Sequence, residues 1–421
     1  MVNSFYELLG LLGQIKGNVL FAILFALVLA YLLSEIFKYF RLPRVIGQIL
    51  AGLIIGIPYI RNHIFTDDVS SVFSFLTNIG IILLFFFVGL EIDFRRFRKN
   101  IKESALISIF NTSLPLFLGF IASRALFNFD NITSLVIGIA LSVSSQAISL
   151  DILEEARLLK SKIGSLIMTA GTIDDVFELL AISIVLIIFN TAIAPESSLQ
   201  KLLLSIAAFV VLILILRVSL IPFALRVFER DKSQAILFMG ALIIVLFMAY
   251  LSELFGVSSL IGALIAGMLV RQTLLSGEHR RPWEKNEISH SIHIISFGFL
   301  IPIFFVNVGL QTDIETISSN LFLAFVLLLI DIGGTIFGTV FAVGLSKGTL
   351  AEGLLVGWAV TPKGDTELVI ATLALQSGLI TIGVYSAIIT VALASTIIAP
   401  IMFKLLLKKY AQELKYSPQK G

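Results

Sequence analysis

Apolar runs long enough to cross a membrane recur along almost the whole chain, and the polar connections between them are short. A membrane-spanning helix needs roughly 20 mostly apolar residues, and on that basis the pattern predicts about thirteen spans. They are centred near Leu27, Ala51, Leu83, Leu114, Ala140, Phe177, Leu212, Ile244, Gly262, Ile301, Leu328, Ile370 and Leu393. We therefore predict an all-α polytopic membrane protein without a separate soluble domain.

The composition fits a chain that buries its surface in the lipid bilayer. Hydrophobic residues make up 57% of the sequence and charged residues 14%, and the mean hydropathy is +1.01. A net charge of +2 at pH 7, with the basic residues spread over loops, gives no reason to expect a nucleic-acid partner. The chain has no cysteine, which excludes disulfides, thiolate metal sites and cysteine nucleophiles. We expect no bound cofactor.

Lysine and arginine are concentrated in the loops after the odd-numbered spans, for example at Arg95, Arg96 and Arg98, and are few after the even-numbered ones. Cytoplasmic loops carry the excess of these residues. The N-terminus is therefore predicted outside and the C-terminus in the cytoplasm. The first apolar run, 19–36, is too long for the core of a signal peptide and is predicted to remain as a span of the cell membrane.

Two pairs of short stretches resemble each other in the same order. Residues 45–52 (VIGQILAG) resemble 260–267 (LIGALIAG), and residues 86–93 (FFVGLEID) resemble 304–313 (FFVNVGLQTD). The offsets are about 220 residues with about seven spans between matching points, and this odd number gives the copies opposite orientations, as in secondary transporters with a midplane site. Within one transmembrane unit, 1–421, we predict a first inverted repeat at 1–190, a linking helix at 191–230, a second repeat at 231–410 and a cytoplasmic tail at 411–421.

The fifth and twelfth spans correspond in this repeat, and polar residues interrupt both of them. The fifth span contains 142–146 (SVSSQ) and the twelfth contains 361–367 (TPKGDTE). Proline and glycine make the second stretch a poor continuous helix. Unwound backbone at membrane depth is tolerated only where protein or a water-filled cavity covers it. We predict two discontinuous helices that cross at the midplane.

Two adjacent acids, Asp174 and Asp175, lie near the middle of the apolar segment 163–189. A carboxylate there costs roughly 2.5–3.5 kcal/mol on insertion scales. Removing a carboxyl group from water raises its pKa by up to about 3–5 units, which brings titration near neutral pH. Such an acid can hold a proton or a metal cation, so we predict that the pair is both cation site and proton carrier. The alternative is a structural pair locked in hydrogen bonds to hydroxyls.

Ser144, Ser145, Lys363 and Asp365 are candidates for supporting this site. The two serines are predicted to offer oxygen atoms to a desolvated cation, because hard cations take oxygen ligands. Small residues that let helices pack closely are the alternative interpretation of the serines. Lys363 and Asp365 are predicted to neutralise the opposed half-helix ends, an architectural role rather than an ion-binding one.

The roles of several other polar residues inside the spans stay open. Glu178, one turn after Asp174, either leads to the site or faces a partner helix. Asp331 is another acid deep in a span, with Thr335 one turn further on. Asn111 and Arg124 have the character of packing and interface residues.

Several stretches of the chain resemble those of the monovalent cation:proton antiporters of the CPA2 group, which include bacterial sodium/proton antiporters and potassium efflux systems. The matching stretches occur in the right order over nearly the whole chain: 42–47 (LPRVIG) with Ala51-Gly52, 80–93, Ser144-Ser145, 172–175 (TIDD), 302–306 (PIFFV) with Gly309-Leu310, and 361–364 (TPKG). The resemblance implies a homodimer in which a core domain, with the acid pair and the crossed helices, slides against a dimerisation domain.

The resemblance further implies that Asp175 is the essential carrier and Asp174 an auxiliary acid, which is often paired with a lysine of the eleventh span. Aligning 334–338 (GTIFG) with the family's motif places Thr335 where that basic residue normally lies. Asp174 therefore lacks its usual partner, and the coupling stoichiometry stays open. The two-acid form is associated with sodium rather than potassium.

The expected function is exchange of a monovalent cation, with Na⁺ favoured and K⁺ as the other candidate, for protons by alternating access, with a role in pH homeostasis and no enzymatic activity. A sodium-coupled solute symporter of similar fold is the alternative, although no further polar cluster is present to line a solute pocket. An intramembrane aspartyl protease needs two carboxyls sharing one proton, and adjacent helix residues do not face each other. A channel or an ion-gated receptor stays open.

Overall fold

The computed structural model describes residues 16–40, 42–91, 101–145, 148–149, 152–153, 156, 158, 161–171, 173–174, 208, 211, 213–217, 234–255, 258–275, 282–312 and 314–410. Within these ranges every regular element is a helix, and no strand occurs. Seven of the helices are long and apolar enough to cross a membrane, or up to eight spans if one bent pair counts as one. The all-α membrane fold is therefore confirmed, while the total of about thirteen spans stays a prediction.

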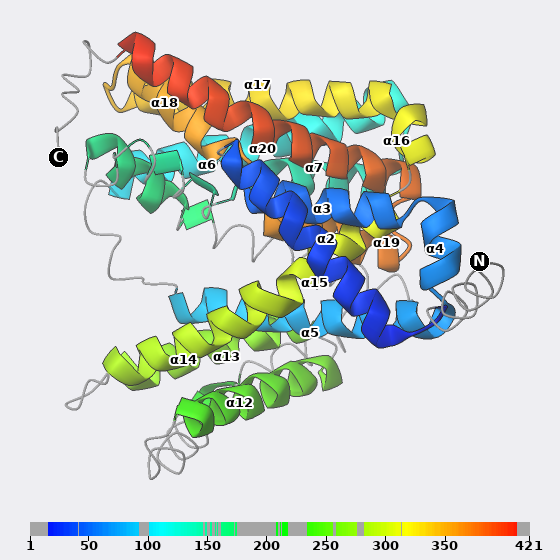
Figure 1. Ribbon diagram of the computed structural model, residues 1–421. Coiled ribbons are helices and arrows are strands. Elements are labelled where there is room, and N and C mark those ends of the chain that lie inside the picture. The colour runs from blue at the N-terminus through cyan, green and yellow to red at the C-terminus, as the bar shows by residue number, and fades with distance from the viewer. Residues whose placement is uncertain are drawn as a thin grey trace. The chain divides into compact units, whose positions relative to one another are not determined.

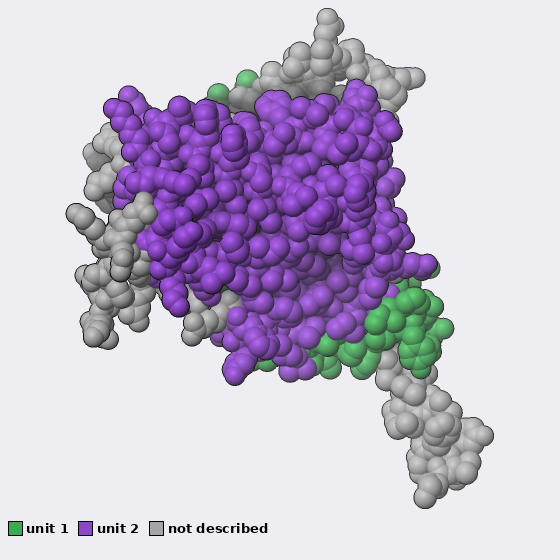
Figure 2. Space-filling view, turned by 90° about the horizontal axis from the view of Figure 1, so that it is seen from above, with its two compact units in different colours: residues 1–31, 57–92, 183–307 green, residues 32–56, 93–182, 308–421 purple. Residues whose placement is uncertain are grey.

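The chain divides into two compact units, each built from segments that are far apart in the sequence (Figure 2). Unit 1 consists of residues 1–31, 57–92 and 183–307, and unit 2 consists of residues 32–56, 93–182 and 308–421. Each unit takes segments from both predicted repeats. Most of the predicted linking helix, 191–230, lies outside the described residues.

Unit 1 contains the described helices α4 (Pro58–Ile64), α5 (Asp67–Glu91), α12 (Gln234–Leu254), α13 (Ser259–Leu275) and α14 (Pro282–Ile295), and the π-helical turn η2 (Ser296–Leu300). Helices α5, α12, α13 and α14 pack on one another (Figure 1). A Cβ atom on Gly89 would lie 2.2 Å from the carbonyl oxygen of Leu264, and one on Gly267 would lie 2.2 Å from that of Phe86. Glycine at both positions allows α5 and α13 to approach this closely.

Unit 2 contains α3 (Arg44–Ile55), α6 (Ile101–Phe127), α7 (Asn131–Ser142), α16 (Ile314–Ser319), α17 (Leu321–Leu345), α18 (Leu350–Val360), α19 (Asp365–Gln376) and α20 (Ile382–Tyr410). Helices α2 (Val19–Tyr39) and α15 (Ile301–Gln311) contribute residues to both units. A Cβ atom on Gly309 would lie 2.0 Å from the carbonyl oxygen of Ile49 and 2.9 Å from Gly52. Gly52 and Gly309, like Gly89 and Gly267, thus form a close contact at matching positions of the predicted repeat.

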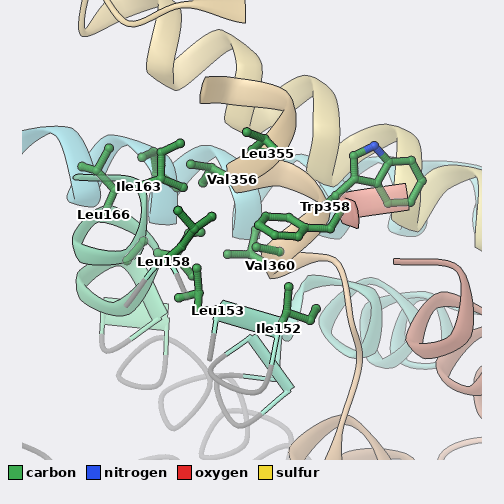
Figure 3. Close-up of a cluster of buried hydrophobic side chains, with 14 of the residues drawn as sticks. Ile152, Leu153, Leu158, Ile163, Leu166, Leu355, Val356, Trp358 and Val360 are labelled. Atoms are coloured by element: carbon green, nitrogen blue, oxygen red, sulfur yellow. The ribbon is translucent and has the colours of Figure 1, made fainter. Parts of the chain in front are cut away.

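A hydrophobic cluster in unit 2 positions the segment that carries Asp174. Leu355, Val356 and Val360 of α18 lie among side chains from residues 152–170, including Leu158 and Leu166 (Figure 3). Helix α18 also packs against α17 and α20 (Figure 1). The cluster therefore joins the segment before Asp174 to the first half of the interrupted helix α18–α19.

Candidate functional site

The two interrupted helices of unit 2 meet at their breaks. Helix α7 ends at Ser142 and is followed by non-helical residues 143–145, while residues 361–364 separate α18 from α19. The backbone N–H of Ser145 donates a hydrogen bond to the carbonyl oxygen of Pro362 at 2.9 Å. The hydroxyl of Ser149 donates to the carbonyl oxygen of Ala359 at 2.7 Å. Two stretches that are far apart in the sequence therefore form one locus of unwound backbone.

The close approach of the two breaks requires glycine at position 364. A Cβ atom there would lie 2.3 Å from the Ser145 hydroxyl oxygen, a distance at which atoms collide. That hydroxyl oxygen accepts a bond from the backbone N–H of Ile148 at 3.5 Å. Ser145 therefore contributes its backbone and hydroxyl to the junction between the breaks.

Lys363 lies at the centre of this junction and is almost completely buried, with 2% of the residue exposed. Its ammonium group donates to the carbonyl oxygens of Leu141 at 2.7 Å and Val143 at 2.6 Å. These carbonyls belong to the C-terminal end of α7, where the helix dipole is negative. The same ammonium lies 2.9 Å from Oδ1 of Asp331 on α17. Asp331, whose role the sequence left open, is therefore the ion-pair partner of Lys363.

Asp174 is 2% exposed and is surrounded by uncharged hydrogen-bond donors. Its Oδ1 accepts bonds from the hydroxyls of Ser108 at 2.6 Å and Thr112 at 3.1 Å. Its Oδ2 accepts bonds from the Asn111 amide at 3.1 Å and the Ser144 hydroxyl at 3.3 Å. The donors come from α6 and from the break after α7, so the acid lies beside the point where the two breaks meet.

The donors on α6 are held in place by a close crossing with α17. A Cβ atom on Gly338 would lie 2.5 Å from the carbonyl oxygen of Phe110, and one on Gly334 would lie 3.2 Å from Pro115. Pro115 has no backbone N–H, so the carbonyl of Asn111 loses the helical hydrogen bond that residue 115 normally donates. The crossing therefore places α17 directly against the part of α6 that binds Asp174.

Of the predicted supporting residues, Ser144 is bonded to Asp174, whereas Ser145 lies at the junction of the breaks. Thr335 is fully buried, and its hydroxyl oxygen has no hydrogen-bond partner among the described residues. None of the four donors to Asp174 described above is a cation. The replacement of the usual basic residue by Thr335 is consistent with this neutral environment.

Three predicted site positions lie outside what the structure describes. Asp175, the predicted carrier, and Glu178 are outside the described residues, and so is the side chain of Asp365. Their roles stay predictions from the sequence.

Three residues that contact Asp174 were not predicted as site residues: Ser108, Asn111 and Thr112. From the sequence alone Asn111 has the character of a packing residue, and the other two are not singled out. A signal was nevertheless present, because polar side chains at spacings of three and four residues within an apolar helix share one face. Such a polar face inside a span indicates a contact with another polar group.

The arrangement around Asp174 suits an acid that changes its charge. Four donors stabilise the carboxylate when it is ionised, because hydrogen bonds to a charged acceptor are the stronger kind. Hydroxyl groups also accept hydrogen bonds, so they can pair with the acid when it is protonated. These hydrogen bonds therefore accommodate both charge states of Asp174.

Comparison with known proteins places this site in context. A family model described as "Sodium/hydrogen exchanger, transmembrane" matches residues 23–409. The chain is 30% identical over 379 residues to a Na(+)/H(+) antiporter of Enterococcus hirae, covering 89% of this chain and 94% of that relative. It is 28% identical over 376 residues to a probable Na(+)/H(+) antiporter of Methanocaldococcus jannaschii, covering 89% and 93%. A Na(+)/H(+)-K(+) antiporter of Bacillus cereus is 24% identical over 338 residues, covering 80% and 83%.

A solved structure shares the fold over nearly its full length. The sodium proton antiporter MjNhaP1 from Methanocaldococcus jannaschii, at pH 8, matches with a TM-score of 0.67. The match covers 97% of this chain and 98% of that chain at 16% sequence identity. The similarity therefore extends to the helical architecture as a whole.

Proposed function

Because the chain belongs to the transmembrane sodium/hydrogen exchanger family, we propose that it exchanges a monovalent cation for protons across a membrane, with Na⁺ favoured. Two of the relatives above are named for Na⁺/H⁺ exchange, and a third is named for both Na⁺ and K⁺. K⁺ is therefore the second candidate substrate. The sodium-coupled symporter that the sequence left open receives no support from these relatives.

The environment of Asp174 is the observation that carries the proposal. This carboxyl group is 98% buried, and none of the four hydrogen-bond donors described for it is a cation that would fix its charge. Burying a carboxylate without a counter-charge costs roughly several kcal/mol, so the group takes up either a proton or a metal cation. This requirement is the basis of exchange.

We propose that the two ions compete for the acid pair Asp174–Asp175. With Asp174 held neutral and Asp175 protonated, the site crosses as a neutral unit, and on the other side Na⁺ displaces the proton of Asp175 and returns. One pKa unit corresponds to about 1.4 kcal/mol, so small differences in environment decide which ion binds. The empty, charged site crosses poorly because an unpaired carboxylate is costly to bury. The protein therefore exchanges the two ions and does not let either of them leak across the membrane.

The proposal includes the topology and assembly predicted from the sequence. The protein is a multi-pass membrane protein, and its described helices expose large apolar side chains such as Leu20, Leu24 and Phe325. We propose a homodimer in the cell membrane, with the N-terminus outside and the C-terminus cytoplasmic. The loop charges support this orientation.

The test is transport by the purified protein in proteoliposomes with an imposed pH gradient. We expect proton-coupled flux with Na⁺ and Li⁺, a smaller flux with K⁺ and Rb⁺, and loss of flux in Asp175→Asn. Asp130, an acid at the start of α7, lies outside the site. The control variant Asp130→Asn should therefore leave the flux unchanged. Repeating the assay with and without a membrane potential measures electrogenicity.

Two results would contradict the proposal. Unchanged flux in a folded Asp175→Asn variant would show that the acid pair does not carry the ions. Na⁺ uptake that depends on an organic solute, or that ignores the pH gradient, would instead favour a symporter or a channel.

A further inference from the structure

A third buried acid of unit 2, besides Asp174 and Asp331, has no role in the site described above. Glu367 lies in the first turn of α19 and is fully buried. Neither of its carboxyl oxygens has a hydrogen-bond partner among the described residues. A glutamate at the third position of a helix commonly bonds back to the residue before the helix, but Glu367 makes no such bond to Gly364. The capping hydrogen bond that a glutamate commonly makes at this position is therefore absent.

The charges around Glu367 do not balance if it is ionised. Lys363 lies four residues before Glu367, in the break that precedes α19. Lys363 already lies 2.9 Å from Asp331. One ammonium would then face two carboxylates, in a cluster whose members are each at least 98% buried. Burying a carboxylate that lacks both a counter-ion and hydrogen bonds is far more costly than burying the neutral acid.

The helices packed around Glu367 supply no further cation among the described residues. Helix α19 packs mainly on α7 and α20. Helix α7 contains no ionisable residue, and α17 contains only Asp331. On α20 the ionisable residue nearest the start is Tyr385, whose hydroxyl donates to the carbonyl oxygen of Val308 at 3.2 Å. The lysines of α20 begin only at Lys404.

We infer that Glu367 carries a bound proton and forms, with Asp331 and Lys363, a second proton-binding site distinct from Asp174–Asp175. Lys363 balances one carboxylate of this site, and the proton neutralises the other. When residue 331 has no charge, Lys363 loses its counter-ion, so Glu367 releases its proton and becomes the partner of Lys363. This inference goes beyond ion exchange and does not depend on which cation is transported.

The first test detects the proton directly. Infrared difference spectra of the full-length protein are recorded at neutral pH in an Asp174→Asn/Asp175→Asn background, with and without Glu367→Gln. We expect the carbonyl band of one protonated carboxylic acid to disappear with Glu367→Gln. Asp130→Asn is the matched control and should remove no such band, because Asp130 is solvent-exposed and ionised at this pH.

The choice of background separates this inference from the proposed exchange mechanism. Both members of the transport pair are neutralised in it, so a failure of the exchange mechanism leaves the expected band unchanged. If the spectra with and without Glu367→Gln show the same protonated-acid bands, Glu367 is ionised and the inference is wrong.

The second test uses the exchange of partners at Lys363. Glu367→Gln replaces a neutral acid by a neutral amide, and Asp331→Asn leaves Glu367 as partner, so each single variant should fold with a modest decrease in melting temperature. The double variant leaves Lys363 without a carboxylate partner. Its melting temperature should therefore fall by much more than the sum of the two single-variant decreases. Additive decreases, or a Glu367→Gln variant that does not fold, would overturn the inference.

Discussion

Asp174 and Asp331 are both acids buried within unit 2, but their surroundings differ in kind. Asp174 is held by hydroxyl and amide groups, whereas Asp331 is paired with the ammonium of Lys363. A hydroxyl donates to a carboxylate and accepts from a carboxylic acid, whereas an ammonium only donates. Asp174 can therefore change its charge without losing its neighbours, while the ammonium of Lys363 favours the ionised form of Asp331. The comparison separates a switchable acid from an architectural one.

Lys363→Met should have the largest effect, because it removes the only cation that pairs with Asp331 among the described residues. Breaking a buried ion pair by removing one partner costs about 3–5 kcal/mol. We expect a large decrease in melting temperature and in the yield of folded protein in detergent. The matched control is Lys162→Met, since Lys162 is half-exposed and lies 3.0 Å from Glu352. An exposed pair contributes about 0–1 kcal/mol, so equal effects of the two variants would contradict the architectural role.

Gly338→Ala should disturb the surroundings of Asp174 without changing any charge. The added methyl group would lie 2.5 Å from the carbonyl oxygen of Phe110 and push α6 away from α17. We expect destabilisation of about 1–3 kcal/mol, together with weaker cation transport. Gly333→Ala on the same helix meets no atom within 4 Å and should be neutral or slightly stabilising. If both variants behave alike in thermal unfolding, the close crossing does not position the donors on α6.

Ser108→Ala removes the shortest hydrogen bond to Asp174, at 2.6 Å. A typical hydrogen bond contributes about 0.5–1.5 kcal/mol, so we expect the Na⁺ concentration for half-maximal exchange to rise by about two- to tenfold. Ser104→Ala is the control, because Ser104 is buried on the same helix and donates to the carbonyl oxygen of Leu166. A rise of equal size in both variants would show that the effect comes from packing and not from the acid.

Asp130→Ala should have the smallest effect on transport, because this acid caps α7 at an exposed position outside the site. The Thr133 hydroxyl, together with the backbone N–H groups of Thr133 and Ile132, holds the pKa of Asp130 below its ordinary value of 3.8. The ionised cap therefore stabilises the fold above pH 3.8, and this contribution is lost as the pH falls through the lowered pKa. We expect a cost of about 0.5–2 kcal/mol near pH 7, which shrinks in acid. A pH-independent difference in melting temperature would contradict a contribution from the charge.

Much of the fold could be predicted because its signals are local. Long apolar runs indicated membrane helices, and the interruptions at 142–146 and 361–367 correspond to the observed breaks after Ser142 and Val360. Gly89, Gly267 and Gly309 belong to the stretches from which the repeat was predicted, and each lies at a close helix contact. Glycine in an apolar helix carries structural information because it permits such contacts.

The partners of the buried acids could not be predicted in the same way. Asp174 follows its donors on α6 by more than sixty residues, and Asp331 is in a different helix from Lys363. The polar residues of α6 were visible in the sequence, yet nothing in their spacing identified the acid that they contact. Likewise, the charge pattern did not show that Lys363 pairs with Asp331 while Glu367 has no hydrogen-bond partner in the described part of the chain.

The sequence by itself determined that this chain is a helical membrane protein with an acid pair inside a span and two interrupted helices, because hydropathy and helix-breaking residues act over a few neighbouring positions. Only the tertiary structure decided which acid is surrounded by neutral donors and which is paired with an ammonium. Hydrogen bonds and ion pairs depend on distances of about 3 Å between atoms of different helices, and these distances are set by how the helices pack.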